Sequence, residues 1–329
     1  MNYLITGATG FIGPWLVKRL VSEGHSCRCL VRSMKAAKDI SVLRNVELIE
    51  GDITDKRSLK NIAASMDGLF HLATLGHVHN FKAPEGVFED VNVAGTKNII
   101  NEAMNGGVKK IVHCSSVAAM GICGDIPANE ESRCRPHHPY GLSKLHAEEL
   151  IRKLFNEQDL PAVVVRFSMV YGPGDWRDML RIVKLVKGRI IPRIGSRPKL
   201  TPLIHVDDAV EGLLLAMQKG RQGETYLITN KNSEPFDRIL KIIAKALKIK
   251  CFTVPVPEWA ALSAASGIEV LYKLFGKSPF ITRKNMESTL ADRVFSVEKA
   301  QKELGFDPSI DPVKGLKDTV LWYKEKGWI

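Results

Sequence analysis

Long uncharged apolar runs are missing from this chain of 329 residues. No stretch reaches the roughly 18 uncharged apolar residues that a membrane-spanning helix needs, so we predict no such helix. The first residues lead directly into a short apolar stretch, with neither a basic segment nor a cleavage site. We therefore expect no secretory signal and a cytoplasmic location.

Cysteine is also scarce, and its six copies are scattered. None of them forms a CxxC pair, and Cys27 and Cys29 fall on one face of a predicted strand. We expect free thiols in a reducing compartment. The two histidine clusters, at positions 77/79 and 137/138, lack cysteine or acidic partners at the spacing of a metal site, so we predict no metal ion.

The composition is that of an ordinary globular protein, with 45% apolar and 25% charged residues. This excludes a disordered chain, a collagen-like fibre and a disulfide-stapled miniprotein. Lys and Arg number 47 against 36 Asp and Glu, which gives a net charge of +11. The positive charges are dispersed and form no tract of the nucleic-acid-binding type. We favour a solvated basic surface over a polyanionic partner and expect no nucleic acid ligand.

Strand-like and helix-like segments alternate through the first half of the chain. This alternation predicts βαβ units and an α/β fold with a doubly wound parallel sheet covered by helices on both faces. The predicted strands are 3–6, 26–31, 46–50, 68–72, 110–115 and 162–167, with 225–229 as a seventh. The amphipathic segments between them are 15–23, 93–104 and 140–157.

After Gly172 the pattern becomes mainly helical. The predicted helices are 177–188, 204–219, 236–247, 259–275, 297–304 and 313–324. We predict a dinucleotide-binding domain over residues 1–168, to which residues 204–230 return. A smaller, mostly helical substrate lobe comprises residues 169–203 and 231–329.

A glycine-rich loop follows the first predicted strand and leads into a helix. Its glycines allow a tight turn, close approach of the backbone to a pyrophosphate, and close packing of helix on strand. The start of the helix offers free N–H groups to phosphates, and Pro14 is tolerated in its first turn. The strand–turn–helix context predicts dinucleotide binding. The loop residues assigned to this role are Gly7, Thr9, Gly10, Phe11, Ile12 and Gly13.

The end of the second predicted strand bears on the choice of dinucleotide. An acidic residue there would bind the ribose 2′-hydroxyl of NAD. The chain instead has Arg32, with Lys35 and Lys38 close by, and an arginine can pair with a 2′-phosphate. We favour NADP, with NAD as the alternative. After the third strand, Asp52 and Ile53 are assigned to the adenine end, although Asp52 could equally cap the next helix.

A second set of residues points to proton transfer. Tyr140 and Lys144 are four residues apart and share a helix face. An ammonium beside a phenol and the cation of an oxidised nicotinamide both favour the phenolate, which lowers a pKa that is ordinarily near 10. Ser116 ends a predicted strand, where α/β sheets place ligand-contacting residues. Ser115 is the competing assignment for the serine.

Taken together, the motifs resemble the extended short-chain dehydrogenase/reductase family. The resemblance rests on the glycine loop, the Ser–Tyr–Lys set and the stretches 71–73, 92–96, 170–174 and 205–208. It implies a Rossmann domain, a nicotinamide cofactor, Tyr140 as acid/base, and Ser116 as the group that orients the carbonyl or alcohol. Lys144 would hold the nicotinamide ribose and lower the tyrosine pKa.

The resemblance also assigns roles to residues outside these motifs. It implies cofactor contacts for Ala73, Thr74, Ser115 and Phe167, and a supporting role for Asn92. Family members are often homodimers through paired helices, which here would include 93–104 and 140–157.

Several departures narrow the choice within the family. The 4,6-dehydratases carry acidic residues after the catalytic serine or threonine, where this chain has alanines and a valine at 117–119. Nucleotide-sugar epimerases carry an asparagine where this chain has Met169, and an arginine in the region of 200–204. Segments 255–259, 278–283 and 295–300 are similar to the 3β-hydroxysteroid dehydrogenase and dihydroflavonol-reductase-like branch.

The leading hypothesis is an NAD(P)(H)-dependent oxidoreductase that interconverts a secondary alcohol and a ketone on a small, lipophilic molecule. A nucleotide-sugar 4-epimerase with tightly held NAD is the alternative, and a non-catalytic NADP sensor is the third. The apolar helix 259–275 could line a lipophilic pocket or contact a membrane surface, but packing on its own core is the favoured interpretation.

Overall fold

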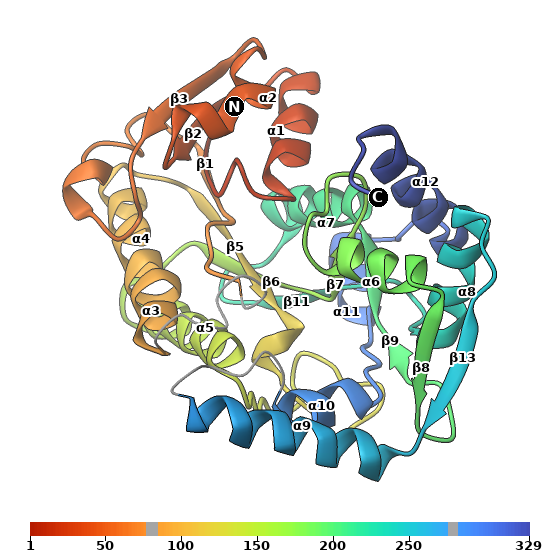
Figure 1. The fold of residues 1–329 in the computed structure, drawn as a ribbon. Helices are drawn as coiled ribbons and strands as arrows, with labels where there is room; N and C mark the ends of the chain where they lie inside the picture. The colour runs from red at the N-terminus through yellow and green to blue at the C-terminus, as the bar shows by residue number, and fades with distance from the viewer. Residues whose placement is uncertain (77–84, 276–281) are drawn as a thin grey trace.

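The computed structural model describes residues 1–76, 85–275 and 282–329 (Figure 1). The histidine pair at 77/79 and most of the stretch 278–283 lie outside these residues. Within them, no helix is both long and apolar enough to cross a bilayer.

A seven-stranded, wholly parallel sheet forms the centre of the molecule (Figure 1). Its strand order β11-β6-β5-β4-β1-β2-β3 confirms the predicted doubly wound Rossmann fold, because the order reverses between β1 and β4. All seven predicted strands are present. They are β1 (Asn2–Thr6), β2 (Ser26–Val31), β3 (Val46–Glu50), β4 (Gly68–His71), β5 (Lys110–Ser116), β6 (Ala162–Phe167) and β11 (Thr225–Ile228).

Helices cover both faces of this sheet. On one face, α1 (Gly13–Ser22) and α7 (Val206–Lys219) bury leucines and valines against the strands. On the other, α4 (Gly95–Asn105) and α5 (Pro139–Gln158) pack their isoleucines on the sheet. A π-helical turn, Asp90–Ala94, precedes α4, and α3 (Glu85–Glu89) precedes that turn. The remaining short helix of this half is α2 (Lys38–Ser41).

The second lobe contains two helix–strand units side by side (Figure 1). α6 (Asp178–Lys187) leads into β8 (Ile190–Ile194), and α8 (Phe236–Leu247) leads into β13 (Phe252–Val256). The two strands pair in parallel, and α12 (Pro312–Glu325) packs on α8. The other helices are α9 (Glu258–Leu274), α10 (Arg283–Leu290) and α11 (Glu298–Leu304).

Two strand pairs join the lobe to the sheet. β7 (Met169–Tyr171) pairs with β10 (Leu203–His205), and β9 (Leu200–Thr201) pairs with β12 (Glu234–Pro235). The helix predicted at 204–219 therefore begins two residues later than expected, because Ile204 and His205 complete β10.

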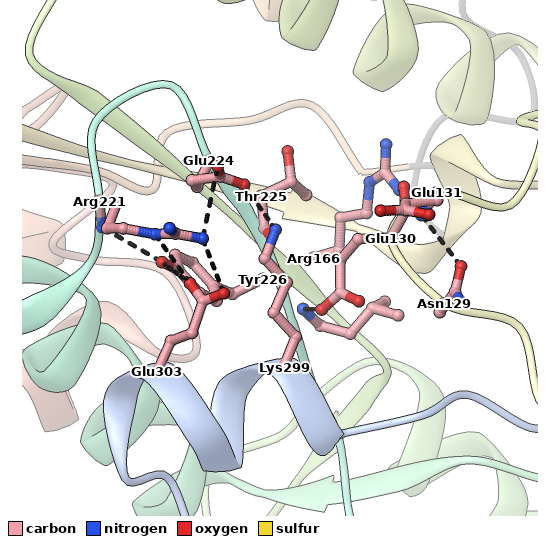
Figure 2. A network of polar contacts seen from close by, with 11 residues as sticks. Asn129, Glu130, Glu131, Arg166, Arg221, Glu224, Thr225, Tyr226, Lys299 and Glu303 are labelled. Carbon is pink, nitrogen blue, oxygen red and sulfur yellow. Dashed lines mark hydrogen bonds and ion pairs between the residues drawn. The ribbon is translucent and has the colours of Figure 1, made fainter.

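A polar network fastens α11 to the edge strand of the sheet (Figure 2). Glu303 accepts hydrogen bonds from Tyr226 Oη and Arg221 Nη2, both at 2.8 Å. Lys299 Nζ lies 2.6 Å from a Glu224 carboxylate oxygen. Further along β11, a Glu130 carboxylate oxygen accepts the backbone N–H of Leu227 at 2.8 Å. The chain beyond the sheet is thus held against β11 by charge-assisted bonds.

Candidate active site

The glycine loop connects β1 to α1 in the geometry that a dinucleotide requires. Gly7 has φ +74°, and a Cβ placed there would lie 2.6 Å from the backbone nitrogen of Ala73. A Cβ on Gly13 would lie 2.3 Å from the carbonyl oxygen of Gly7. Both positions therefore admit only glycine, and the turn is tight enough for a phosphate to approach its backbone.

The N-terminus of α1 has no side-chain cap. Its N-cap residue, Ile12, makes no side-chain capping bond, and Pro14 occupies the first turn. The N–H groups that a capping side chain would otherwise satisfy remain available to an anion. Thr9 and Gly10 are exposed beside them, whereas Phe11 is buried. The loop thus fits the pyrophosphate of a dinucleotide.

The residues assigned to the adenosine end lie beyond β2 and β3. Arg32 directly follows β2 and is exposed, and it makes no hydrogen bond or ion pair with any described residue. Asp52 Oδ1 accepts bonds from the backbone and hydroxyl of Thr54, both at 2.8 Å, whereas the residue that caps the next helical turn, Lys56–Leu59, is Asp55. Ile53 is buried against Gly95 of α4.

The loop after β4 is tied to the helical layer by Asn92. Its Oδ1 accepts the Thr74 hydroxyl at 3.0 Å and the Leu75 N–H at 2.7 Å, and its Nδ2 donates to Ser143 Oγ at 2.9 Å. Asn92 is 1% exposed, so it supports the loop that holds Ala73 and Thr74. Cofactor contacts of Ala73 and Thr74 remain a prediction.

A column of buried polar groups fixes the ends of β1 and β4 beneath this loop. His71 Nδ1 lies 2.6 Å from Thr6 Oγ1, and its Nε2 lies 2.9 Å from Thr96 Oγ1. Burial, with a smaller contribution from the Lys144 charge, lowers the pKa of His71 to about 3. His71 is therefore neutral at physiological pH and does not act as a general acid.

The two candidate serines separate at the end of β5. Ser115 is buried and donates its hydroxyl hydrogen bond to Glu148 of α5, which pairs with Arg166 of β6. Ser116 lies on the opposite side of the strand, as alternation requires, and its Oγ caps the following turn at Ala118 N, 3.1 Å away. Of the two serines, only Ser116 acts on Tyr140, where its hydroxyl favours the phenolate and lowers the pKa. A cofactor contact of Ser115 stays a prediction, and Phe167 is 3% exposed in the core.

Tyr140 stands in the first turn of α5, which begins at Pro139 with His138 as its N-cap. The Tyr140 ring is stacked on His138 at 6.2 Å between ring centres. Burial raises the pKa of Tyr140 to about 12, and the Arg177 charge and the Ser116 hydroxyl act in the opposite direction. Without the cofactor, desolvation of the phenolate thus outweighs the nearby cation, and the lowering expected with the nicotinamide cation bound stays a prediction.

Lys144 lies one turn further along α5 and is 2% exposed. Its ammonium donates to the Cys114 carbonyl oxygen at 2.7 Å, and burial lowers its pKa. This bond anchors Lys144 to β5, beside the strand end that carries Ser116. The structure thus brings Ser116, Tyr140 and Lys144 to one edge of the sheet.

Arg177 completes the site and was missed as a specific candidate in the sequence. Its guanidinium carbon lies 5.8 Å from the Phe11 ring centre and 5.9 Å from the Trp176 ring centre. Its Nε is buried without a hydrogen-bond partner among the described residues. Proximity of one arginine to the glycine loop and to Tyr140 arises only on folding, and no sequence spacing could have signalled it.

Comparison with known proteins bears on this arrangement. A family model described as the NAD dependent epimerase/dehydratase family matches residues 3–229. The chain belongs to this family. Its members use a nicotinamide dinucleotide, and the chain is accordingly an enzyme of the oxidoreductase type, which confirms the resemblance seen in the sequence.

Individual relatives cover nearly the whole chain. A 4-hydroxy-2-methyl-3-oxo-4-farnesyl-3,4-dihydroquinoline-1-oxide ketoreductase of Stigmatella aurantiaca is 28% identical over 96% of this chain and 95% of its own. A putative dihydroflavonol 4-reductase of Synechocystis sp. is 30% identical over 99% and 96%. The crystal structure of gox2253 superposes with a TM-score of 0.86 at 30% identity, over 99% of this chain and 98% of that one.

Proposed function

We propose that the protein is an NADP(H)-dependent oxidoreductase that interconverts a secondary alcohol and a ketone on a small, lipophilic substrate. The observation that carries this proposal is the packing of the first turn of α5, which holds Tyr140, against the turn that follows Ser116, with Lys144 anchored to the same strand by the Cys114 carbonyl. Two relatives of similar length are named as reductases, one of them acting on a farnesylated ketone, which supports the same reaction class.

The three side chains divide the work of proton transfer. Ser116 orients the substrate oxygen, and Tyr140 donates its proton to that oxygen in reduction or removes it in oxidation. Lys144, held by the Cys114 carbonyl, places its charge beside the nicotinamide ribose. When bound, the cofactor supplies or accepts the hydride, and its oxidised ring favours the phenolate. A phenol that is protonated at neutral pH suits the reductive direction.

The absence of acidic groups after Ser116 argues against dehydration. Residues Val117–Ala119 form a buried turn that carries no acidic side chain. Elimination of a hydroxyl group would need a proton donor at this place. Ketone reduction needs none beyond Tyr140.

NADP is the proposed cofactor because Arg32 is exposed at the end of β2 and has no described acidic partner. A 2′-phosphate would pair with this guanidinium. In Arg32→Glu, we expect the Kd for NADPH to rise tenfold or more, because a charge-assisted bond worth about 1.5–3 kcal/mol is lost. The Kd for NADH should change little. Equal effects on both cofactors would refute the preference.

The nucleotide-sugar 4-epimerase remains the alternative because the family model includes epimerases. A reductase consumes NADPH in proportion to the ketone reduced and releases NADP. An epimerase copurifies with NAD and shows no net redox change. Mass spectrometry of the released cofactor, together with NADPH consumption on a panel of lipophilic ketones, separates the two.

Replacement of Tyr140 by Phe tests the chemistry. We expect ketone turnover to fall by about 10²–10⁴-fold, as for loss of a general acid, while the Kd for NADPH stays within about twofold. Turnover equal to that of the unaltered protein would show that another group moves the proton.

A further inference from the structure

The second lobe concentrates positive charge. Two segments, 179–206 and 238–257, contain 12 Lys and Arg residues and no Asp or Glu. They fold next to each other, because α6 packs on α8 and β8 pairs with β13 (Figure 1). The basic character that looks dispersed in the sequence is therefore gathered on one part of the molecule.

The cations are densest where the helices turn into the strands. The backbone N–H of Phe252 donates to the Arg189 carbonyl at 2.7 Å, which brings the two turns together. Six cations at this end of the lobe are exposed and form no ion pair with any described residue. They are Lys184, Lys187, Arg189, Lys245, Lys248 and Lys250.

An apolar face adjoins these cations. The strand register places Ile190 beside Phe252 and Pro192 beside Val254, so these four side chains share one face of the two-stranded sheet. Ile190, Phe252 and Val254 are 62%, 71% and 46% exposed. On the other face, Ile191 is buried in the core of the lobe. The outward face of this two-stranded sheet is thus apolar. The six cations lie at the end where the two strands begin.

We propose that this β8–β13 surface, made of the four apolar residues and the six cations, docks on an anionic lipid bilayer. Exposed apolar side chains would enter the boundary of the acyl chains, and lysine and arginine side chains would reach the phosphates of the headgroups. The proposal is independent of the reaction catalysed at Tyr140. It also differs from a contact through α9, which the apolar sequence of that helix suggested.

Two other occupants fit the observations less well. The phosphates of a nucleic acid would match the cations, but they would leave Ile190, Pro192 and Val254 in water. A second copy related by a two-fold axis through this surface would bring the six cations near the same six of its partner. A bilayer satisfies both the charge and the apolar face.

The test is co-sedimentation of the full chain with vesicles. One set contains phosphatidylcholine alone, and the other contains phosphatidylcholine with about one third phosphatidylglycerol. On such an anionic surface, each nearby lysine contributes about fivefold in affinity. Three variants are compared with the unaltered chain: Lys187→Glu/Lys250→Glu, Phe252→Ser, and the matched control Lys60→Glu/Lys109→Glu. The control changes the same charge at exposed positions of the Rossmann domain.

We expect binding to the anionic vesicles only, weakened by added salt. The Lys187/Lys250 variant should lose at least about 25-fold in affinity, from fivefold for each lysine removed, and the control less than about threefold. Phe252→Ser should weaken binding to the same vesicles without altering the far-ultraviolet circular dichroism spectrum.

Three results would overturn the proposal. They are absence of binding to anionic vesicles, an equal loss in the control variant, and unchanged binding in Phe252→Ser, which would mean non-specific charge attraction. Binding to single-stranded RNA that depends on Lys187 and Lys250, with no vesicle binding, would assign the surface to nucleic acid instead.

Discussion

At the scale of single residues, the protonation state of Tyr140 depends on two opposing effects on its pKa, which are burial and nearby positive charge. Burial raises the pKa of this phenol to about 12, although Arg177 and Ser116 both favour the phenolate. The protein alone therefore keeps Tyr140 protonated over the whole physiological range. Tyr140 can therefore donate a proton without help from a cofactor charge. To remove a proton, it needs the additional positive charge of an oxidised cofactor.

Arg177 offers a way to shift this balance. In Arg177→Gln, loss of the cation should raise the pKa of Tyr140 further, because the phenolate loses a favourable charge interaction. Alcohol oxidation requires the deprotonated phenol, so its rate should fall several-fold at neutral pH, and the rising limb of its pH profile should move to higher pH. Profiles of kcat/KM for oxidation measure this shift.

Arg177→Lys is the matched control, since it keeps the charge but loses the planar group beside Phe11 and Trp176. The control should retain the pH profile of the unaltered enzyme. A loss of activity in both variants with no movement of the profile would mean that Arg177 acts by packing and has no electrostatic effect on Tyr140.

The choice between Ser115 and Ser116 shows where sequence reasoning stops. Neighbouring residues of a strand face opposite sides, so an error of one residue in the alternation exchanges their surroundings. The sequence contains no marker that fixes this alternation. The buried pair of Glu148 and Arg166, which engages Ser115, shows in the folded chain that Ser116 is the serine on the side of Tyr140.

At the scale of elements, the strands of the large sheet were predictable because each is a short apolar run between helical patterns. The strands β8 and β13 were not, since Pro192 and Pro255 interrupt them and prolines argue against strands. They tolerate proline because each is an edge of a two-stranded sheet. α10 was missed because its sequence is largely polar.

The junction of β1 with α1 yields a prediction about cofactor binding. In Gly13→Ala, the added Cβ would clash with the Gly7 carbonyl, so the loop must shift away from its phosphate-binding geometry. We expect a loss of about 1–3 kcal/mol in the free energy of unfolding, as for other overpacked positions, and weaker NADPH binding by isothermal titration.

Gly267→Ala in α9 is the control for this loop variant, because a Cβ there meets nothing within 4 Å. It should gain about 0.5–1 kcal/mol in stability, as alanine is the better helix former, and leave the Kd for NADPH unchanged. Unaltered NADPH binding in Gly13→Ala would show that the cofactor does not use this loop.

The buried ion pair between α5 and β6 yields a prediction about stability. Glu148 and Arg166 are nearly inaccessible, and their closest charged atoms lie 2.6 Å apart. Glu148→Gln leaves the guanidinium charge buried without its counter-ion, so urea denaturation should show a loss of about 3–5 kcal/mol. The double variant Glu148→Gln/Arg166→Met should recover part of this loss. A double variant less stable than the single one would contradict the argument.

At the scale of the whole molecule, the two proposed contact surfaces lie on different sides. The helices α4 and α5 flank one side of the Rossmann sheet, and β8 and β13 lie at the far edge of the second lobe (Figure 1). A dimer formed through α4 and α5 would therefore leave the β8–β13 surface of each copy accessible. Pairing of copies and docking on lipid do not compete for the same residues.

The family resemblance predicts such a dimer, and an exposed row that runs from the π-helical turn into α4 provides its test. Ala94, Lys97 and Asn101 are exposed and lie on one side, three to four residues apart. Ala94→Arg/Asn101→Arg would place two bulky charges in a helix-to-helix contact, where burying an unpaired charge is strongly unfavourable. Light scattering after size exclusion should give twice the 36.5 kDa mass of the chain for the unaltered protein, and a value shifted towards one chain for the variant. A monomeric unaltered protein, or a dimer that the variant leaves intact, would place any association elsewhere on the surface.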